Sequence, residues 1–177
     1  MKKTNVRKLV VASLFLALAM VLPMLTGQLP QLGAKLLPMH IPVLLCGFIC
    51  GWQYGLIVGF TAPLLRSVIF GMPVLYPVAA AMAFELAAYG FFAAFLIKYL
   101  PKRALCIYPA LICSMLLGRV VWGIARLIMY GIRGTAFTWS IFAAGAFVDA
   151  LPGIIIQLII IPPLVIALKR VEKSGGA

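Results

Sequence analysis

The chain has 177 residues, of which 65% are hydrophobic and only 10% are charged. A soluble domain carries about 25% charged residues, so lipid rather than water must surround much of this apolar surface. The 15 Lys and Arg residues against 3 Asp and Glu would suggest nucleic-acid binding in a soluble protein. In so apolar a chain they are typical of the cytoplasmic flanks of membrane spans, and we expect no nucleic-acid partner.

Six apolar runs are candidates for membrane helices, which take about 17–25 residues each. In chain order they are residues 9–26, 40–53, 55–71, 77–98, 106–131 and 140–168. The second and third are short and joined by a tight Gly51–Gly55 turn, so this pair is either a full hairpin or partly re-entrant. The connections are rich in Gly, Pro and polar residues. No polar linker divides the chain, which predicts one membrane domain over residues 1–177.

The basic residues predict the orientation. With the N-terminus in the cytoplasm, ten Lys and Arg residues fall at the inner ends of the spans, and the outer loops carry only Lys35 and Arg133. The inner residues are Lys2, Lys3, Arg7, Lys8, Lys98, Lys102, Arg103, Lys169, Arg170 and Lys173. This asymmetry requires an even number of spans. The predicted fold is therefore an all-α membrane protein, a six-helix bundle with both termini cytoplasmic.

Five charged side chains lie inside the apolar spans, where each costs about 2.5–3.5 kcal/mol at the bilayer centre. They are Arg66, Glu85, Arg119, Arg126 and Asp149. Such residues persist when they pair with one another, face a wet cavity or hold a ligand. Counted from the span ends, four of the five lie in the outer half, close to His40 at the start of the second span. We therefore expect a pocket open to the outside, the alternative being Arg–acid pairs that only hold helices together.

Aromatic residues accompany these charges at helical spacing. One face of the fifth span carries Arg119, Trp122, Arg126 and Tyr130, and one face of the fourth carries Met82, Glu85 and Tyr89. On the sixth span, Trp139, Asp149 and Gly153 lie on or near one side. Such a pocket suits a small polar molecule with a flat or apolar part. Three buried arginines face two buried acids, so one guanidinium is left for a ligand carboxylate or phosphate. Backbone carbonyls or water could serve instead.

Small residues recur every four positions at Gly47, Gly51, Gly55 and Gly59, and again at Ser13 and Ala17. Small residues allow helix backbones to approach closely. From the pattern alone, these positions pack within the fold or against another subunit, with internal packing the preferred interpretation.

The sequence contains no Walker motif, no nucleophile beside a His and an acid, no metal-ligand cluster and no cofactor motif. Its four cysteines lie in apolar surroundings, which is typical of structural packing. We therefore expect no cofactor, no metal and no catalysis. Two rival hypotheses remain: an intramembrane enzyme that uses Glu85, Asp149 and His40 for acid–base chemistry, and a small structural or assembly protein.

One block of sequence resembles the substrate-binding S-components of energy-coupling factor (ECF) transporters. It comprises Leu37-Pro38-Met39-His40-Ile41-Pro42-Val43, Cys46-Gly47-Phe48-Ile49-Cys50-Gly51, Tyr54-Gly55, Gly59, Pro63-Leu64-Leu65-Arg66 and Gly71-Met72-Pro73. The resemblance implies a protein of a prokaryotic plasma membrane that binds a vitamin or related micronutrient from outside. It also implies docking on a transmembrane coupling subunit driven by two ATPase subunits.

The resemblance also implies residue roles. Ser13 and Ala17 match the small-x-x-x-small motif that contacts the coupling subunit, with Ser in place of the usual Ala. The pocket positions of the family contain Gln28, Gln31, His40, Met72, Tyr76, Glu85, Arg119, Trp122, Arg126, Trp139 and Asp149; the charge and face arguments add Arg66 and Tyr89. Pantothenate is the first expected ligand, because its carboxylate suits the surplus arginine. Hydroxymethylpyrimidine, a pyridoxine-type vitamin, riboflavin and queuosine remain open.

Overall fold

The computed structural model describes residues 3–26, 36–101, 104–132 and 150–174, and within these ranges all regular structure is helical. The long helices are α1 (Lys3–Val21), α3 (His40–Cys50), α4 (Trp52–Phe70), α5 (Ala80–Tyr99), α6 (Ile107–Ile132) and α8 (Leu151–Ser174). Three short turns extend them: the 3-10 turns η1 (Leu22–Thr26) and η3 (Ala104–Cys106), and the π-helical turn η2 (Leu75–Ala79). The predicted all-α architecture is confirmed.

Within these described ranges, five helical stretches are long and apolar enough to cross a membrane. They are Val6–Met24, Trp52–Phe70, Leu75–Tyr99, Ala104–Gly131 and Leu151–Val171. The remaining helix, α3, is apolar but has only 11 residues. At 1.5 Å per residue it is about 17 Å long, against about 30 Å for the hydrocarbon core of a bilayer. The second predicted span is therefore present as a short helix.

Single glycines and prolines set the observed helix boundaries. Gly51, with φ 101°, alone separates α3 from α4, so the expected turn reaching Gly55 was too long, and Trp52 begins the next helix. Gly71 ends α4 in the left-handed conformation, and its N–H donates to the Ser67 carbonyl, because glycine adopts this conformation without a Cβ penalty. Leu100 is extended at the end of α5, as expected of a residue before a proline.

The first and last predicted spans need correction. α1 begins at Lys3 and gives way to the 3-10 turn at Leu22, next to Pro23, so the α-helix is shifted toward the N-terminus relative to the predicted 9–26, which it overlaps. The last helix continues to Ser174, beyond the predicted end at residue 168. Residues 140–149 of that predicted span lie outside the described residues.

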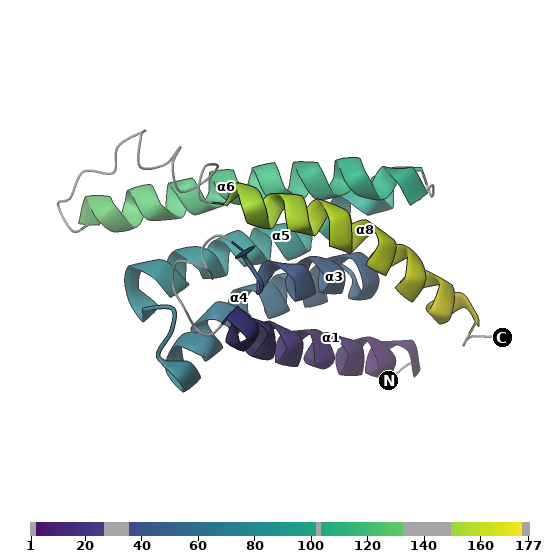
Figure 1. Cartoon of the computed structure of the whole chain (residues 1–177), viewed down its shortest axis with the longest axis horizontal. Coiled ribbons are helices and arrows are strands. Elements are labelled where there is room, and N and C mark those ends of the chain that lie inside the picture. The colour runs from purple at the N-terminus through teal and green to yellow at the C-terminus, as the bar shows by residue number, and fades with distance from the viewer. Residues whose placement is uncertain (1–2, 27–35, 102–103, 133–149, 175–177) are drawn as a thin grey trace.

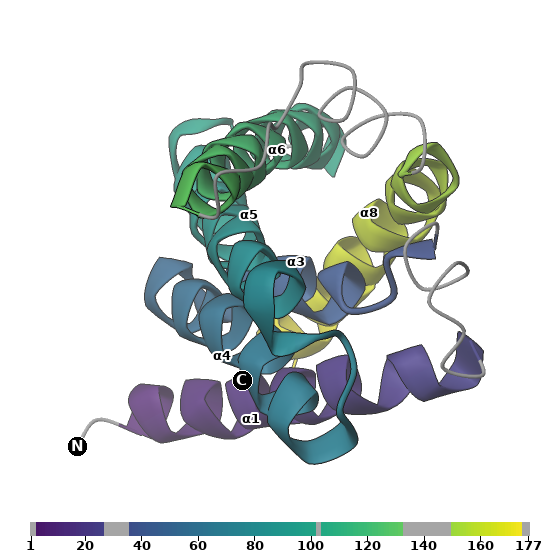
Figure 2. The ribbon, with the colours of Figure 1, turned by 90° about the vertical axis from the view of Figure 1, so that its left-hand side faces the viewer.

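The helices form one bundle in which α5 contacts α3, α4 and α6, while α1 contacts α3 and α4, and α8 contacts α3 and α6. Seen along the bundle, α5 and α6 lie on one side of α3, and α8 lies on the other (Figure 2). α1 runs across the base at a steep angle to the rest (Figure 2). The start of α1 and the end of α8 lie toward the same end of the molecule (Figure 1).

Glycines allow α3, α4 and α5 to approach backbone to backbone. A Cβ atom at Gly47 or Gly55 would lie closer than 3.0 Å to the Gly90 backbone, and one at Gly59 equally close to Leu86. No atom lies within 4 Å of the corresponding position at Gly51, which serves the turn instead. The expected internal packing is therefore confirmed for three of the four glycines.

We predict that Gly90→Ala destabilises the fold by about 1–3 kcal/mol, because the new methyl group would meet the Gly55 backbone, which cannot move aside cheaply. Thermal unfolding in detergent measures the effect. Gly131→Ala is the matched control, since nothing lies within 4 Å of its added carbon. Equal unfolding temperatures for the two variants would contradict the packing.

Candidate functional site

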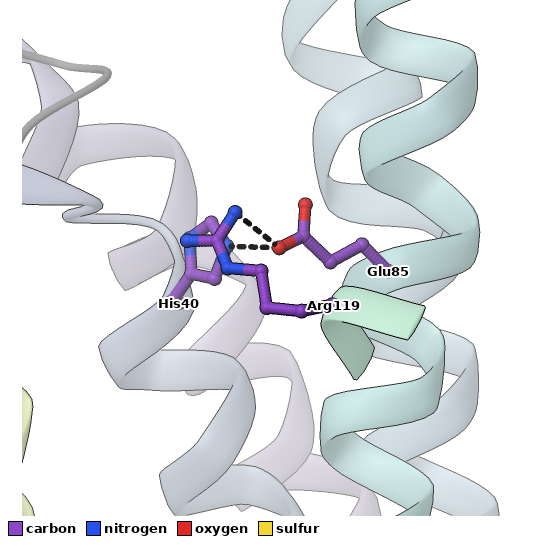
Figure 3. Close-up of polar contacts among 3 residues, drawn as sticks. All are labelled: His40, Glu85 and Arg119. Carbon is purple, nitrogen blue, oxygen red and sulfur yellow. Dashed lines mark ion pairs between the residues drawn. The ribbon is translucent and has the colours of Figure 1, made fainter. Parts of the chain in front are cut away.

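A buried cluster of charged groups joins three helices. Glu85 on α5 forms an ion pair with Arg119 on α6, with 2.9 Å between Arg119 Nη1 and Glu85 Oε1. His40, the first residue of α3, directs Nε2 toward the same oxygen at 3.6 Å, which is too long for a hydrogen bond. Figure 3 shows the Arg119 and His40 side chains converging on the carboxylate. All three residues are buried, so the charges of Arg119 and Glu85 interact in a poorly screened environment.

Tyr89 completes the cluster from α5, one turn after Glu85. Its ring meets the His40 imidazole edge-on, with 5.2 Å between the ring centroids, and the charges of both Glu85 and Arg119 act on its hydroxyl. Gly118 on α6 makes room for this ring, because a Cβ there would overlap it. The predicted face of Glu85 and Tyr89 therefore exists and is directed at α3 and α6.

Arg126 lies among aromatic side chains on α6. Its guanidinium carbon is 5.2 Å from the Trp122 ring centroid and 5.6 Å from that of Tyr130, and Nη1 donates to the Tyr130 hydroxyl at 3.1 Å. The predicted stripe of these residues is therefore confirmed as one helix face. Cation–π contacts of this kind contribute about 0.5–2 kcal/mol each and leave guanidinium hydrogens available.

The turn before α5 is fastened to the end of α6. The Tyr76 hydroxyl donates to the Met129 carbonyl at 3.0 Å, and Met72, four residues earlier, is half-buried. Met129 and Trp122 belong to a small apolar cluster with Ala81. The hydrogen bond brings Tyr76, one of the expected loop residues, to the end of α6 that carries Arg126.

Arg66 makes different contacts from the other charges. It is buried on α4, where Nη1 donates to the Met20 carbonyl of α1 and the guanidinium lies over the Phe70 ring, 5.2 Å from its centroid. Met20 is in the last turn of α1, whose carbonyls have no partner within the helix. In the described residues, Arg66 therefore joins α1 to α4.

Several buried polar atoms of the cluster have no hydrogen-bond partner within the described parts of the chain. They are Nε and Nη2 of Arg119, Nδ1 of His40 and the Tyr89 hydroxyl, and Nε of the nearby Arg126 belongs to the same class. A buried polar group left without a partner costs about 1–3 kcal/mol, and more when charged. The cluster is thus arranged to make further hydrogen bonds.

Gln157 is a buried polar residue that the sequence reasoning missed. It is fully buried on α8, and neither its amide oxygen nor its amide nitrogen has a partner among the residues described. The available signal was a lone amide in the run Ile154-Ile155-Ile156-Gln157-Leu158-Ile159. A pattern built on charged residues in apolar runs does not include this uncharged amide.

The remaining expected residues divide into two groups. Ser13 and Ala17 are exposed on α1, and the Ser13 hydroxyl donates to the Leu9 carbonyl of its own helix. Gln28, Gln31, Trp139 and Asp149 lie outside the described residues. No group of three or more His, Cys, Asp or Glu that could hold a metal occurs in the described ranges.

The comparisons with known proteins give one decisive match. A family model described as "ECF transporter, substrate-specific component" matches residues 7–165 of the 177. The chain belongs to this family. No curated protein and no solved structure matches it significantly.

The expected resemblance is therefore confirmed: this S-component is a transporter component and a multi-pass membrane protein. Membership implies a small-molecule substrate and association with the transmembrane and ATPase subunits of an ECF module. The family match assigns no residue roles, and the buried cluster is the part of the structure that bears on them.

We predict that Glu85→Ala destabilises the S-component by about 3–5 kcal/mol, because it leaves the Arg119 guanidinium buried without its counter-ion. Adding Arg119→Met should recover most of that loss, since the uncompensated charge is then removed. Thermal unfolding of the two single variants and the double variant measures the coupling. Additive losses would contradict the pairing.

Proposed function

We propose that this S-component captures a small anionic vitamin or related micronutrient at the outer face and delivers it through an ATP-driven coupling module. One observation carries the proposal. Arg119 uses Nη1 for Glu85, while Nε and Nη2 are buried without a partner in the described ranges. The ion pair thus positions the guanidinium without saturating it.

The unsaturated edge of Arg119 has the geometry that oxoanions prefer. Nε–H and the adjacent Nη2–H are parallel in the planar guanidinium, and such a pair donates two hydrogen bonds to one carboxylate or phosphate. Glu85 balances only one of the two arginines on α6, because Arg126 contacts aromatic rings instead. The described part of the site therefore has an excess of positive charge, which favours an anionic ligand.

Pantothenate is our first candidate for this ligand. Its single carboxylate suits the free Arg119 edge, and its aliphatic part suits the apolar surroundings of the cluster. Hydroxymethylpyrimidine, pyridoxine-type vitamins, riboflavin and queuosine are the competing candidates. Trp122 and Tyr89 would favour those with flat rings.

We further propose a single membrane domain with six passes and both termini in the cytoplasm of a prokaryotic cell. The start of α1 and the end of α8 lie toward the same end of the molecule (Figure 1), which supports an even number of passes. The distribution of Lys and Arg supports the orientation. Ser13 and Ala17 are exposed on α1, which supports a contact with the transmembrane coupling subunit there. Two ATPase subunits would supply the energy.

Arg119→Lys should lower pantothenate affinity at least about tenfold while the protein still folds, because lysine keeps the charge beside Glu85 but has no parallel pair of donors. Isothermal titration calorimetry on purified protein measures the effect. Pantothenyl alcohol, which lacks the carboxylate, should bind the wild type weakly and lose little more in the variant. Equal losses for both compounds would contradict carboxylate binding at Arg119.

Arg126→Ala should also weaken pantothenate binding strongly without unfolding the protein, since Arg126 is only half-buried and its contacts lie on its own helix. Arg170→Ala, at an exposed site on α8, is the matched control and should bind normally. Unchanged affinity in Arg126→Ala would place the site elsewhere.

Mass spectrometry of small molecules that copurify with the wild type, together with a turnover assay, separates the rival functions. We expect a retained molecule that is released chemically unchanged. A modified product would support the intramembrane enzyme. For a purely structural protein, exchanging Glu85 and Arg119 would restore full function, and no molecule would be retained.

A further inference from the structure

Gln157 lies on the inward face of α8. Ile154 and Ile161, three and four residues away and hence on the same side of the helix, pack in or against the central core cluster, which also contains Tyr89. With no part of its surface exposed, the Gln157 amide is therefore directed into the bundle.

The helices that α8 contacts are those that carry the charged cluster. α8 packs against α3, which begins with His40, and against α6, which carries Arg119. α3 and α8 run in the same direction in Figure 1, so their first turns lie toward the same end of the molecule. Gln157 is six residues after the start of α8, or about 9 Å along the helix, and so lies in the first half of α8.

A primary amide offers one acceptor oxygen and a two-hydrogen donor nitrogen, and buried amides are normally hydrogen-bonded. Neither atom of Gln157 is bonded to any described residue. An alkyl side chain of the same size would pack in this Ile-rich helix without that penalty. The amide is thus unfavourable for the empty fold and needs a reason outside it.

We propose that Gln157 is a ligand-binding residue whose amide pairs with an amide group of the substrate, while the free edge of Arg119 takes its carboxylate. The proposal rests on the proposed function and narrows the substrate class to a small carboxylic acid that carries an amide. Pantothenate has both groups. Hydroxymethylpyrimidine and pyridoxine have neither, and riboflavin has no carboxylate, so the two residues together discriminate among the candidates.

Gln157→Leu tests the assignment through two readouts of opposite sign. We expect the ligand-free variant to unfold at a higher temperature than the wild type, because a buried unpaired amide has been removed. Its affinity for pantothenate should fall about tenfold, the usual effect of losing a buried hydrogen bond to a ligand. Gln53→Leu, at an exposed glutamine on α4, is the matched control and should change neither quantity.

Each alternative outcome has a definite meaning. A lower unfolding temperature for Gln157→Leu would show that the fold already pairs the amide, and unchanged affinity would show that it lies outside the site; either result overturns the assignment. If the wild type ignores pantothenate but retains another molecule, the ligand of the proposed function is wrong. The test of Gln157 is then the amount of that molecule retained per mole of protein by Gln157→Leu and by the wild type. Equal amounts would overturn the assignment of Gln157 to the site. A wild type that binds neither would overturn both proposals.

Discussion

The ion pair between Glu85 and Arg119 is the interaction on which the proposed site depends. Transferring two charges from water to an apolar interior costs several kcal/mol per ion, and their mutual attraction repays this only when the remaining hydrogen-bonding groups are also satisfied. Here they are not, because the pair leaves a guanidinium edge unused in the described residues. The pair fixes α5 against α6, brings the His40 end of α3 alongside, and holds a cationic donor in a geometry that a ligand can complete.

Much of this arrangement could be predicted from the sequence because charges in lipid are so unfavourable. A long apolar run containing Glu85 or Arg119 has few explanations, and the all-α class follows from the same runs. The pairing could not be predicted, since Arg66, Arg119 and Arg126 are chemically alike and differ only in position. The partner of Arg66 is the Met20 carbonyl, and a backbone group leaves no trace in a residue pattern. Gln157 could not be predicted as a buried polar residue, because an uncharged amide barely changes the hydropathy of an Ile-rich helix.

The glycine series shows how one periodic pattern can serve two physical purposes. A four-residue repeat predicts one helix face, and Gly47, Gly55 and Gly59 do contact α5 closely. Gly51 has the same spacing, yet it is needed for its positive φ of 101°, which few other residues adopt without strain. Spacing alone cannot tell whether a glycine is required for close helix packing or for a positive φ, because glycine meets both requirements.

The close backbone contacts among α3, α4 and α5 have a consequence for substrate release. Because the backbones meet directly at Gly47, Gly55, Gly59 and Gly90, we expect the three helices to resist sliding and to move as one unit that carries His40 and Glu85. Arg119 and Gln157 belong to α6 and α8, outside it. A substrate held by Arg119 and Gln157 would bridge α6 and α8. Moving α6 and α8 apart would then release it, without distorting the contacts among α3, α4 and α5.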